Sequence, residues 1–350
     1  MMNRYHGMGA LMLAVAGVAG AQDDAAWRDE HTLIVTASNT AANQLLLYSV
    51  TGNFVRQIPT QGQGGVSGNA GGIAQDRDHL AVVNFGSGTV SLFTKDLEHT
   101  SLRFEQVIQA VASPVSVAFG DDHLYILSTT HVESHPMNRN GVNASADGVA
   151  ALLHADGSAA QVGKLPGQLI ITEKSNVIES VKLGAGGALT GPASLVSNIP
   201  TNVNAPFGLI TRGNDAYVTI AHANEISLVR HDDVLTVTGS GTQSAPCWLA
   251  LDGPFLFSSN SPSQSISRYA VYGRTIVQDA AVVAMLHGDP TDITYRGGLA
   301  AVIDANGTVS HLSVFHVDED GNLSLSGVAT INHAATNGVA IVGRENRENF

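Results

Sequence analysis

Polar side chains recur where alternating apolar runs end, and two of these side chains could act as an acid or a base. Glu173 follows the run LIIT, and His222 follows the run YVTIA. A positioned carboxylate or imidazole can take a proton from water. We therefore predict that Glu173 and His222 are catalytic. Four further side chains at matching positions could hydrogen-bond a ligand: Asn84, Thr129, Asn260 and Asp304.

A structural role is the alternative for these six positions. Asn, Asp and Thr often satisfy backbone groups where a strand ends, so they could be turn residues. Glu173 is followed by Lys174, but neighbouring residues of a strand face opposite sides, and we do not expect the two to pair. Glu173 could instead be a solvated carboxylate, or one paired with another Lys or Arg.

The stretch THVESHP contains three side chains of metal-binding type. His131, Glu133 and His135 alternate, so they share a face if the stretch is extended. Two imidazoles and a carboxylate suit Zn²⁺, but a structural site needs a fourth ligand, the HExxH spacing is absent and Pro136 bends the run. We predict no metal site and no cofactor, while the question of a metal at these three residues stays open.

An internal repeat relates the six candidate positions, and a period of about 40 to 47 residues is typical of β-propeller blades. Each unit has an introducing strand, a tight turn, a second strand, a polar break and a third strand that leads into a looser fourth. Such runs predict consecutive antiparallel strands. Seven introducing strands begin at Gly71, Pro114, Ala159, Pro206, Pro246, Pro290 and Asn337.

The two ends of the repeat complement each other. The first run, from Leu33, lacks an introducing strand, and the last, NGVAIV from Asn337, lacks followers. We predict an all-β fold, a seven-bladed β-propeller whose blade 1 is completed by the C-terminal strand, which removes a free sheet edge. The six candidates would then gather at one mouth of the central channel. Residues 130–148 are expected to form a polar insertion in the third blade, at one face of the disc.

The N-terminal segment indicates export. Residues 1–21 resemble a signal peptide, with Arg4 before the apolar run MGALMLAVAGVAG and small residues before Gln22. Residues 22–350 are then a single domain, because no low-complexity linker interrupts the repeats. We expect a periplasmic or secreted protein. No second long apolar run follows, so we expect no membrane insertion.

Composition narrows the class of partner. Only 13% of the residues are charged and 5% are aromatic, while 37 are Gly, a balance typical of turn-rich all-β proteins. The formal net charge of −13 disfavours nucleic acid and anionic membrane surfaces as partners. The one cysteine, Cys247, cannot form an internal disulfide. We expect a monomer whose partner is a small-molecule ligand or an envelope protein.

Four stretches in consecutive blades resemble a known family: AAQVGKLPGQLIITEKSN, APFGLI, APCWLAL and SSNSPSQSISRY. They are similar to the seven-bladed lactonase-like propellers, which include 6-phosphogluconolactonase and carboxymuconate cyclase, and within these to a secreted bacterial branch. In the characterised enzymes, an Arg with a neighbouring His heads one inner strand and a Glu ends the strand after it. Here Pro206, Phe207 and Ala221 occupy those positions. The resemblance thus implies the fold, while the Arg, His and Glu set is not matched.

Two functions follow from these observations. The first is a secreted lactonase-like hydrolase or cyclase that opens or closes a small lactone at the channel mouth, with Glu173 or His222 activating water. The second is a non-catalytic envelope propeller that binds a protein, peptide or glycan through its loops, since a repeat scaffold can vary its loops independently.

Overall fold

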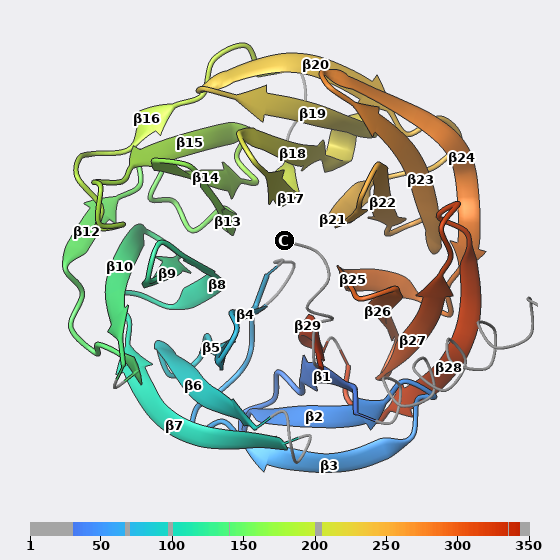
Figure 1. Cartoon of the computed structure of the whole chain (residues 1–350), viewed down its shortest axis with the longest axis horizontal. Helices are drawn as coiled ribbons and strands as arrows, with labels where there is room; N and C mark the ends of the chain where they lie inside the picture. The colour runs from blue at the N-terminus through green and yellow to red at the C-terminus, as the bar shows by residue number, and fades with distance from the viewer. Residues whose placement is uncertain are drawn as a thin grey trace, which may run out of the picture.

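Within residues 31–66, 71–96, 101–139, 141–199, 205–334 and 336–343, which a computed structural model of the chain describes, seven β-sheets surround a central axis (Figure 1). The segment expected to be the signal peptide lies outside these residues. The seven introducing runs form the innermost strands, as the repeat predicts. The prediction of a seven-bladed β-propeller is therefore confirmed.

Each blade runs outward from the channel in the order of its strands, except in blade 1. The innermost strands are β29 (Asn337–Val342), β4 (Ile73–Gln75), β8 (Pro114–Gly120), β13 (Ala159–Leu165), β17 (Pro206–Arg212), β21 (Pro246–Asp252) and β25 (Asp289–Arg296). The second strands are β1 (Leu33–Ala37), β5 (His79–Asn84), β9 (His123–Ser128), β14 (Gln168–Glu173), β18 (Asp215–Ile220), β22 (Phe255–Asn260) and β26 (Leu299–Asn306).

The outer half of each blade is built in the same way. The third strands are β2 (Gln44–Ser49), β6 (Thr89–Asp96), β10 (His131–Asn138), β15 (Val177–Lys182), β19 (Glu225–Arg230), β23 (Ser265–Tyr272) and β27 (Val309–Val317). The fourth strands are β3 (Phe54–Pro59), β7 (Ser101–Gln109), β12 (Gly148–Ala151), β16 (Ser194–Leu195), β20 (Asp233–Gly239), β24 (Thr275–Met285) and β28 (Leu323–Ile331). The helical part of the described residues is one 3-10 turn, η1 (Ala221–Ala223), and none of their helices is long and apolar enough to cross a membrane.

Both ends of the described chain meet in blade 1. The C-terminal strand β29 pairs antiparallel with β1, with Leu33 opposite Val342 and Val35 opposite Ala340. This pairing gives the blade its innermost strand and closes the ring, so that β1 is not left with a free edge. The predicted completion of blade 1 by the C-terminal strand is thereby confirmed.

One buried side chain reinforces this closure. Thr36 in β1 is fully buried, and its hydroxyl donates to the carbonyl oxygen of Gly338 in β29 at 2.8 Å. Thr36→Val keeps the shape of the side chain and removes the donor, so we expect the free energy of unfolding to fall by about 1–2 kcal/mol. Urea unfolding measures this loss. The exposed Thr330 on β28 supplies the control, since Thr330→Val should change stability by less than about 0.5 kcal/mol.

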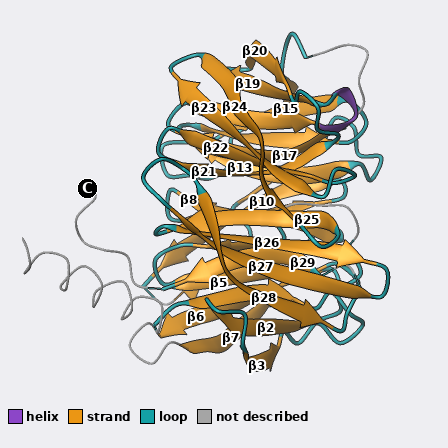
Figure 2. Cartoon of the chain, turned by 90° about the vertical axis from the view of Figure 1, so that its right-hand side faces the viewer, coloured by secondary structure: helices purple, strands orange, loops and turns teal. Residues whose placement is uncertain are grey.

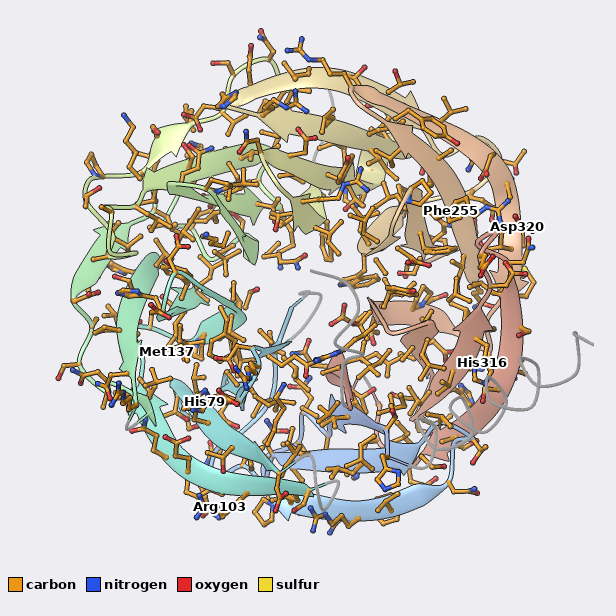
Figure 3. All side chains as sticks on the ribbon, viewed as in Figure 1. His79, Arg103, Met137, Phe255, His316 and Asp320 are labelled. Atoms are coloured by element: carbon orange, nitrogen blue, oxygen red, sulfur yellow. The ribbon has the colours of Figure 1, made fainter. Side chains whose placement is uncertain are left out.

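Packing between blades explains why the second strands are apolar on both faces. Every residue of β9 and of β1 is buried, because each sheet packs against a neighbouring blade on either side. Side chains fill the spaces between the blades, whereas Arg103 and Asp320 lie on the rim of the disc (Figure 3). A view of the disc from its edge shows the sheets of neighbouring blades packed next to one another (Figure 2). The core is therefore a ring of layers between sheets.

The polar segment at residues 130–148 differs from its expected structure. Its first half is β10, the third strand of blade 3, and its second half includes β11 (Gly141–Val142), which pairs with the end of β10. The segment is polar because the inward-facing side chains of β10, Glu133 and His135 among them, are held by hydrogen bonds in the core. It is thus part of the blade and not an insertion at one face.

Candidate functional site

Four of the six sequence candidates occupy equivalent positions in the structure. Asn84, Glu173, Asn260 and Asp304 lie at or near the ends of second strands, and all four are fully buried. Thr129 and His222 lie beyond those ends, half-buried and exposed respectively. The equivalent positions in their blades are Ser128 and Ile220, which pair with Pro114 and Pro206 as Glu173 pairs with Ala159.

Asn84 connects two blades. Its Oδ1 accepts hydrogen bonds from Asn43 Nδ2 at 3.0 Å and Thr60 Oγ1 at 2.7 Å in blade 1, and its Nδ2 donates to Ser91 Oγ at 2.7 Å. Asn260 has a comparable role inside blade 6, where its Nδ2 donates to Ser267 Oγ at 2.8 Å. Both amides are fully engaged with the protein, so neither is available to a ligand in this arrangement.

Glu173 forms a buried carboxyl pair with Glu179 of β15. Glu179 accepts the backbone N–H groups of Leu153 and His154 at 3.0 and 3.1 Å. Oε2 of Glu173 accepts from Ser158 Oγ at 3.2 Å, and Oε1 lacks a partner among the described residues unless the acid is protonated and donates to Glu179. Burial, and then the neighbouring Glu179, raises the pKa of Glu173 to about 9. At neutral pH Glu173 is therefore a neutral acid that is poorly suited to activate water.

The positively charged residues near these positions have other contacts. Lys174 lies with Nζ 5.9 Å from the ring centroid of Phe207, and burial lowers the pKa of its ammonium. Arg212 donates to the hydroxyl of Tyr217 at 3.2 Å, and Arg268 pairs with Asp279 of the outer strand β24 at 3.1 Å. These three cations thus have separate surroundings and do not converge on Glu173.

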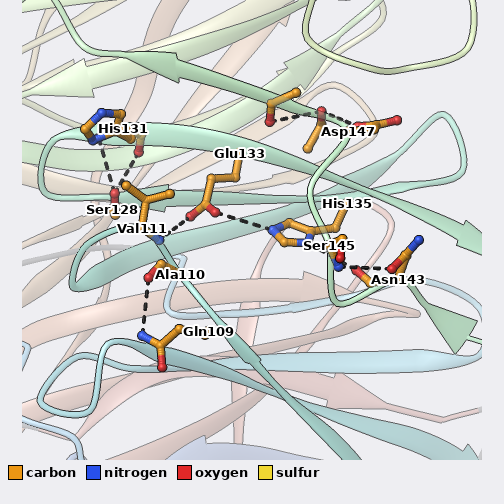
Figure 4. A network of polar contacts seen from close by, with 12 residues as sticks. Gln109, Ala110, Val111, Ser128, His131, Glu133, His135, Asn143, Ser145 and Asp147 are labelled. Carbon is orange, nitrogen blue, oxygen red and sulfur yellow. Dashed lines mark hydrogen bonds and ion pairs between the residues drawn. The ribbon is translucent and has the colours of Figure 1, made fainter.

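His131, Glu133 and His135 are not arranged as metal ligands. Oε2 of Glu133 accepts the backbone N–H of Val111 at 2.9 Å and Oε1 lies 3.7 Å from Nε2 of His135, whereas His131 points away from this pair (Figure 4). Nδ1 of His131 contacts the hydroxyl of Thr130 at 2.8 Å. Across the described residues, no group of three or more His, Cys, Asp or Glu could hold a metal ion. In this structure Glu133 connects blade 3 to the segment that enters it.

The central channel contains a cavity of about 400 Å³. All seven innermost strands contribute residues to its wall. None of the six sequence candidates, all of which the structure describes, lines this cavity. Its polar and charged lining side chains are Gln75, Gln161, Lys164, Thr211, Asp292 and Thr294.

Asp292 of β25 is the carboxyl group of the cavity wall. It is 6% exposed, and its Oδ1 accepts the N–H of Ile293 at 2.8 Å. Burial raises its pKa to about 7, although hydrogen bonds from the N–H groups of Ile293, Val339 and Gly71 oppose the shift. A carboxylate offers about four lone-pair sites, so three backbone donors leave one for a water or ligand. A base with a pKa near the operating pH is well matched to proton transfer.

Trp248 of β21 belongs to the same wall, and its indole ring carries a hydrogen-bond donor. The side chain is 5% exposed and packs edge to face against Phe207, with ring centroids 5.4 Å apart. Its Nε1–H is buried and has no partner among the described residues. A buried donor without a partner costs free energy, so this N–H is a polar group that the fold leaves unsatisfied within the described residues.

The cavity contains little free positive charge. Lys164 is the cation of its wall, and Nζ pairs with Asp121 Oδ1 at 2.5 Å. Gln161 is engaged as well, since its Oε1 accepts the N–H of Leu209 at 2.6 Å. The wall therefore favours a neutral polar ligand over a phosphorylated one, because phosphate is normally bound by several cationic or N–H donors.

The sequence contained a signal for Asp292 and Trp248. Both are the third residue of their introducing runs, PTD and PCW, and so is Gln161 in AAQ. The repeat placed these residues on the innermost strands, but the backbone bulges there, between Pro290 and Asp292 and between Pro246 and Trp248. A bulge changes which side chain faces the channel, so simple alternation could not identify the residues of the wall.

No protein-family model matches the chain, and no curated protein sequence is significantly similar to it. Solved structures are similar in fold. A Bacteroides fragilis protein provisionally named a 6-phosphogluconolactonase aligns with a TM-score of 0.62 at 15% identity, over 89% of this chain and 97% of that one. A Bacteroides uniformis protein with the same provisional name aligns with a TM-score of 0.64 at 16% identity, over 89% of this chain and 99% of that one.

The chain therefore has the fold of the lactonase-like propellers. Propeller lyases have a related structure, since virginiamycin B lyase from Staphylococcus aureus aligns at a TM-score of 0.52 and 13% identity, over 77% of this chain and 94% of that one. This likeness in fold agrees with the resemblance found in the repeats. At these identities it describes the fold, so the chemistry has to be argued from the cavity.

Proposed function

We propose that this lactonase-like propeller hydrolyses a small neutral lactone in its central cavity, with Asp292 as the general base. The observation that supports the proposal is a carboxyl group with a pKa of about 7 in the wall of a cavity of about 400 Å³. Ligand sites of small molecules commonly have volumes of about 300–1,000 Å³. The cavity is therefore large enough for a five- or six-membered ring and a water molecule.

The chemistry needs two groups that the wall supplies. The carboxylate of Asp292 takes a proton from water while the water oxygen attacks the lactone carbonyl carbon. Negative charge then develops on the carbonyl oxygen, and Nε1–H of Trp248 would stabilise it once the indole ring turns this buried donor toward the cavity. When the ring C–O bond breaks, the leaving oxygen takes the proton back from Asp292. The product is the open hydroxy acid, and Asp292 returns to its ionised form.

The test is a panel of neutral γ- and δ-lactones and their phosphorylated or carboxylated analogues. Titration of the released acid at constant pH measures the rate of hydrolysis. Neutral lactones are expected to be hydrolysed faster than the anionic analogues, because Lys164 is already paired with Asp121. The absence of turnover with the whole panel would contradict the proposal.

A second function rests on the bonds that Asp292 makes. Asp292 receives backbone N–H groups from blades 1, 2 and 7, so it could serve to hold the innermost strands together, and the cavity or the loops could bind a partner without turnover. In that case a lactone or an envelope protein would bind to the propeller, and the bound lactone would be recovered intact.

Export is part of the same proposal, because lactones of the growth medium or envelope would then be the available substrates. Removal of residues 1–21 predicts a mature chain that begins at Gln22. Intact-mass measurement and N-terminal sequencing of protein from a secretion-competent host check this expectation. A mature protein that keeps Arg4 and stays in the cytoplasm would be the contrary result.

A further inference from the structure

Two histidines from neighbouring segments meet where blade 6 leads into blade 7. His287 lies in the connection between β24 and β25 and is exposed, whereas His311 belongs to β27 and its side chain is 13% exposed. Their ring centroids are 5.1 Å apart, and the ring planes differ by 37°. The pair is separate from the central cavity, whose wall includes neither residue.

The carboxylate of Asp304 holds both histidines in place. Its Oδ1 accepts a hydrogen bond from Nδ1 of His311 at 2.8 Å, and its Oδ2 accepts the backbone N–H of His287 at 3.3 Å. The carbonyl oxygen of His287 accepts from Nδ2 of Asn306 at 2.9 Å, so the backbone of His287 is fixed from two sides. Asp304 itself is fully buried, which makes it a rigid support.

This support determines which nitrogen of His311 is free. A carboxylate only accepts hydrogen bonds, so Nδ1 of His311 is the donor to Asp304 and Nε2 is the nitrogen left for a ligand. Metal-binding histidines usually donate their other N–H to a carboxylate in this manner, which fixes the ring and raises its basicity. The ring of His287 has no hydrogen-bond partner within the described part of the chain, and so offers a second nitrogen.

The separation of the rings suits one shared ion. With metal–nitrogen distances of about 2.0 Å and a tetrahedral angle, the centroids of two ligating imidazoles lie about 5 Å apart. The observed 5.1 Å agrees with this value. Imidazole pairs prefer zinc, copper and nickel to calcium or magnesium, and the protein's net charge of −13 favours cations in general.

We propose that His287 and His311 bind one divalent transition-metal ion of the zinc, nickel or copper class, with Asp304 as a positioning residue. Water completes the coordination shell, because two protein ligands leave the remaining positions open. The contrast with blade 3 supports the choice of site: His135 of β10 is 1% exposed and bonds the carbonyl of Asn143 through Nδ1, whereas His287 is open to solvent.

Calorimetric titration of the mature protein with Zn²⁺ tests the proposal, using protein prepared without a polyhistidine tag. We expect one saturable site in the wild type. His287→Ala and His311→Gln should each weaken it at least tenfold, and Asp304→Asn should weaken it about 10- to 100-fold by releasing the ring of His311. Substitution of Co²⁺ adds a visible absorption band that reports the imidazole ligands.

The exposed His222 provides the matched control, since His222→Ala removes a histidine from another blade and should leave Zn²⁺ affinity unchanged. Unfolding curves show whether Asp304→Asn still folds. If it does not fold, the His287→Ala variant still tests the proposal, because His287 is exposed and its substitution should not affect folding. The proposal is overturned by a wild type without a saturable site, or by equal affinity in the wild type and in a variant that lacks both His287 and His311. Turnover of lactones does not enter this test, so it stands apart from the proposed function.

Discussion

Asp292→Asn is expected to lower kcat/KM for lactone hydrolysis by about 100-fold or more, because a positioned general base commonly contributes a factor of about 10²–10⁴. The base works only when it is ionised, and the pKa of Asp292 is about 7. In the wild type kcat/KM should therefore rise about tenfold per pH unit below pH 7 and level off above it. The residual kcat/KM of the Asp292→Asn variant should not show this rise with pH.

A second substitution separates catalysis from structural support. Asp292 also accepts three backbone N–H groups, and the amide of Asn replaces one acceptor oxygen with a donor, so the variant could be destabilised. Trp248→Phe keeps an aromatic ring against Phe207 and removes the Nε1 donor together with the volume of the second indole ring. We expect Trp248→Phe to fold normally and to lose about 10- to 100-fold in kcat. Unchanged rates in both folded variants would locate the chemistry outside the cavity.

Glu173→Gln is expected to make the protein more stable than the wild type at pH 8–9. The pKa of Glu173 is about 9 in the folded protein, against about 4.5 in an unfolded chain. The folded state therefore holds a proton that the unfolded state releases as the pH rises from about 4.5 to 9, and wild-type stability falls across this window. Gln cannot ionise, and its Nε2 can donate to Glu179 in place of the acid proton.

Urea unfolding at pH 5, 7 and 9 measures this effect. Near pH 5 the free energies of unfolding of the wild type and the variant should differ by less than about 1 kcal/mol. At pH 9 the free energy of unfolding of the variant should be higher by roughly 2 kcal/mol or more. Glu133→Gln is the matched control, because Glu133 is also a buried glutamate, but its carboxyl group lies beside the imidazole of His135. A wild-type stability that does not change from pH 5 to pH 9 would show that Glu173 is ionised in the fold.

The architecture could be read from local patterns. Seven introducing runs predicted seven innermost strands, and the complementary ends at Leu33 and Asn337 predicted the pairing of β1 with β29. Both inferences depend on strand periodicity and on the need to pair every buried sheet edge, which repeat in each blade. The prediction was wrong in blade 3, where residues 130–148 were expected to be a polar insertion. Their first half is strand β10, whose polar residues are buried, and a polar sequence is typical of a loop unless the partners of its side chains are known.

The sites were decided by tertiary contacts, within blades as well as between them. The pKa of about 9 at Glu173 depends on burial and then on Glu179 beside it, and the pKa of about 7 at Asp292 depends on burial in the channel wall. The pairing of His287 with His311 depends on the junction of two blades. Desolvation and neighbouring charge are properties of the packed molecule, so residue type and spacing could not predict them. The periodic sequence determined the ring of seven sheets. The bulges in the innermost strands and the packing of the blades determined which polar side chains face the cavity and which are buried.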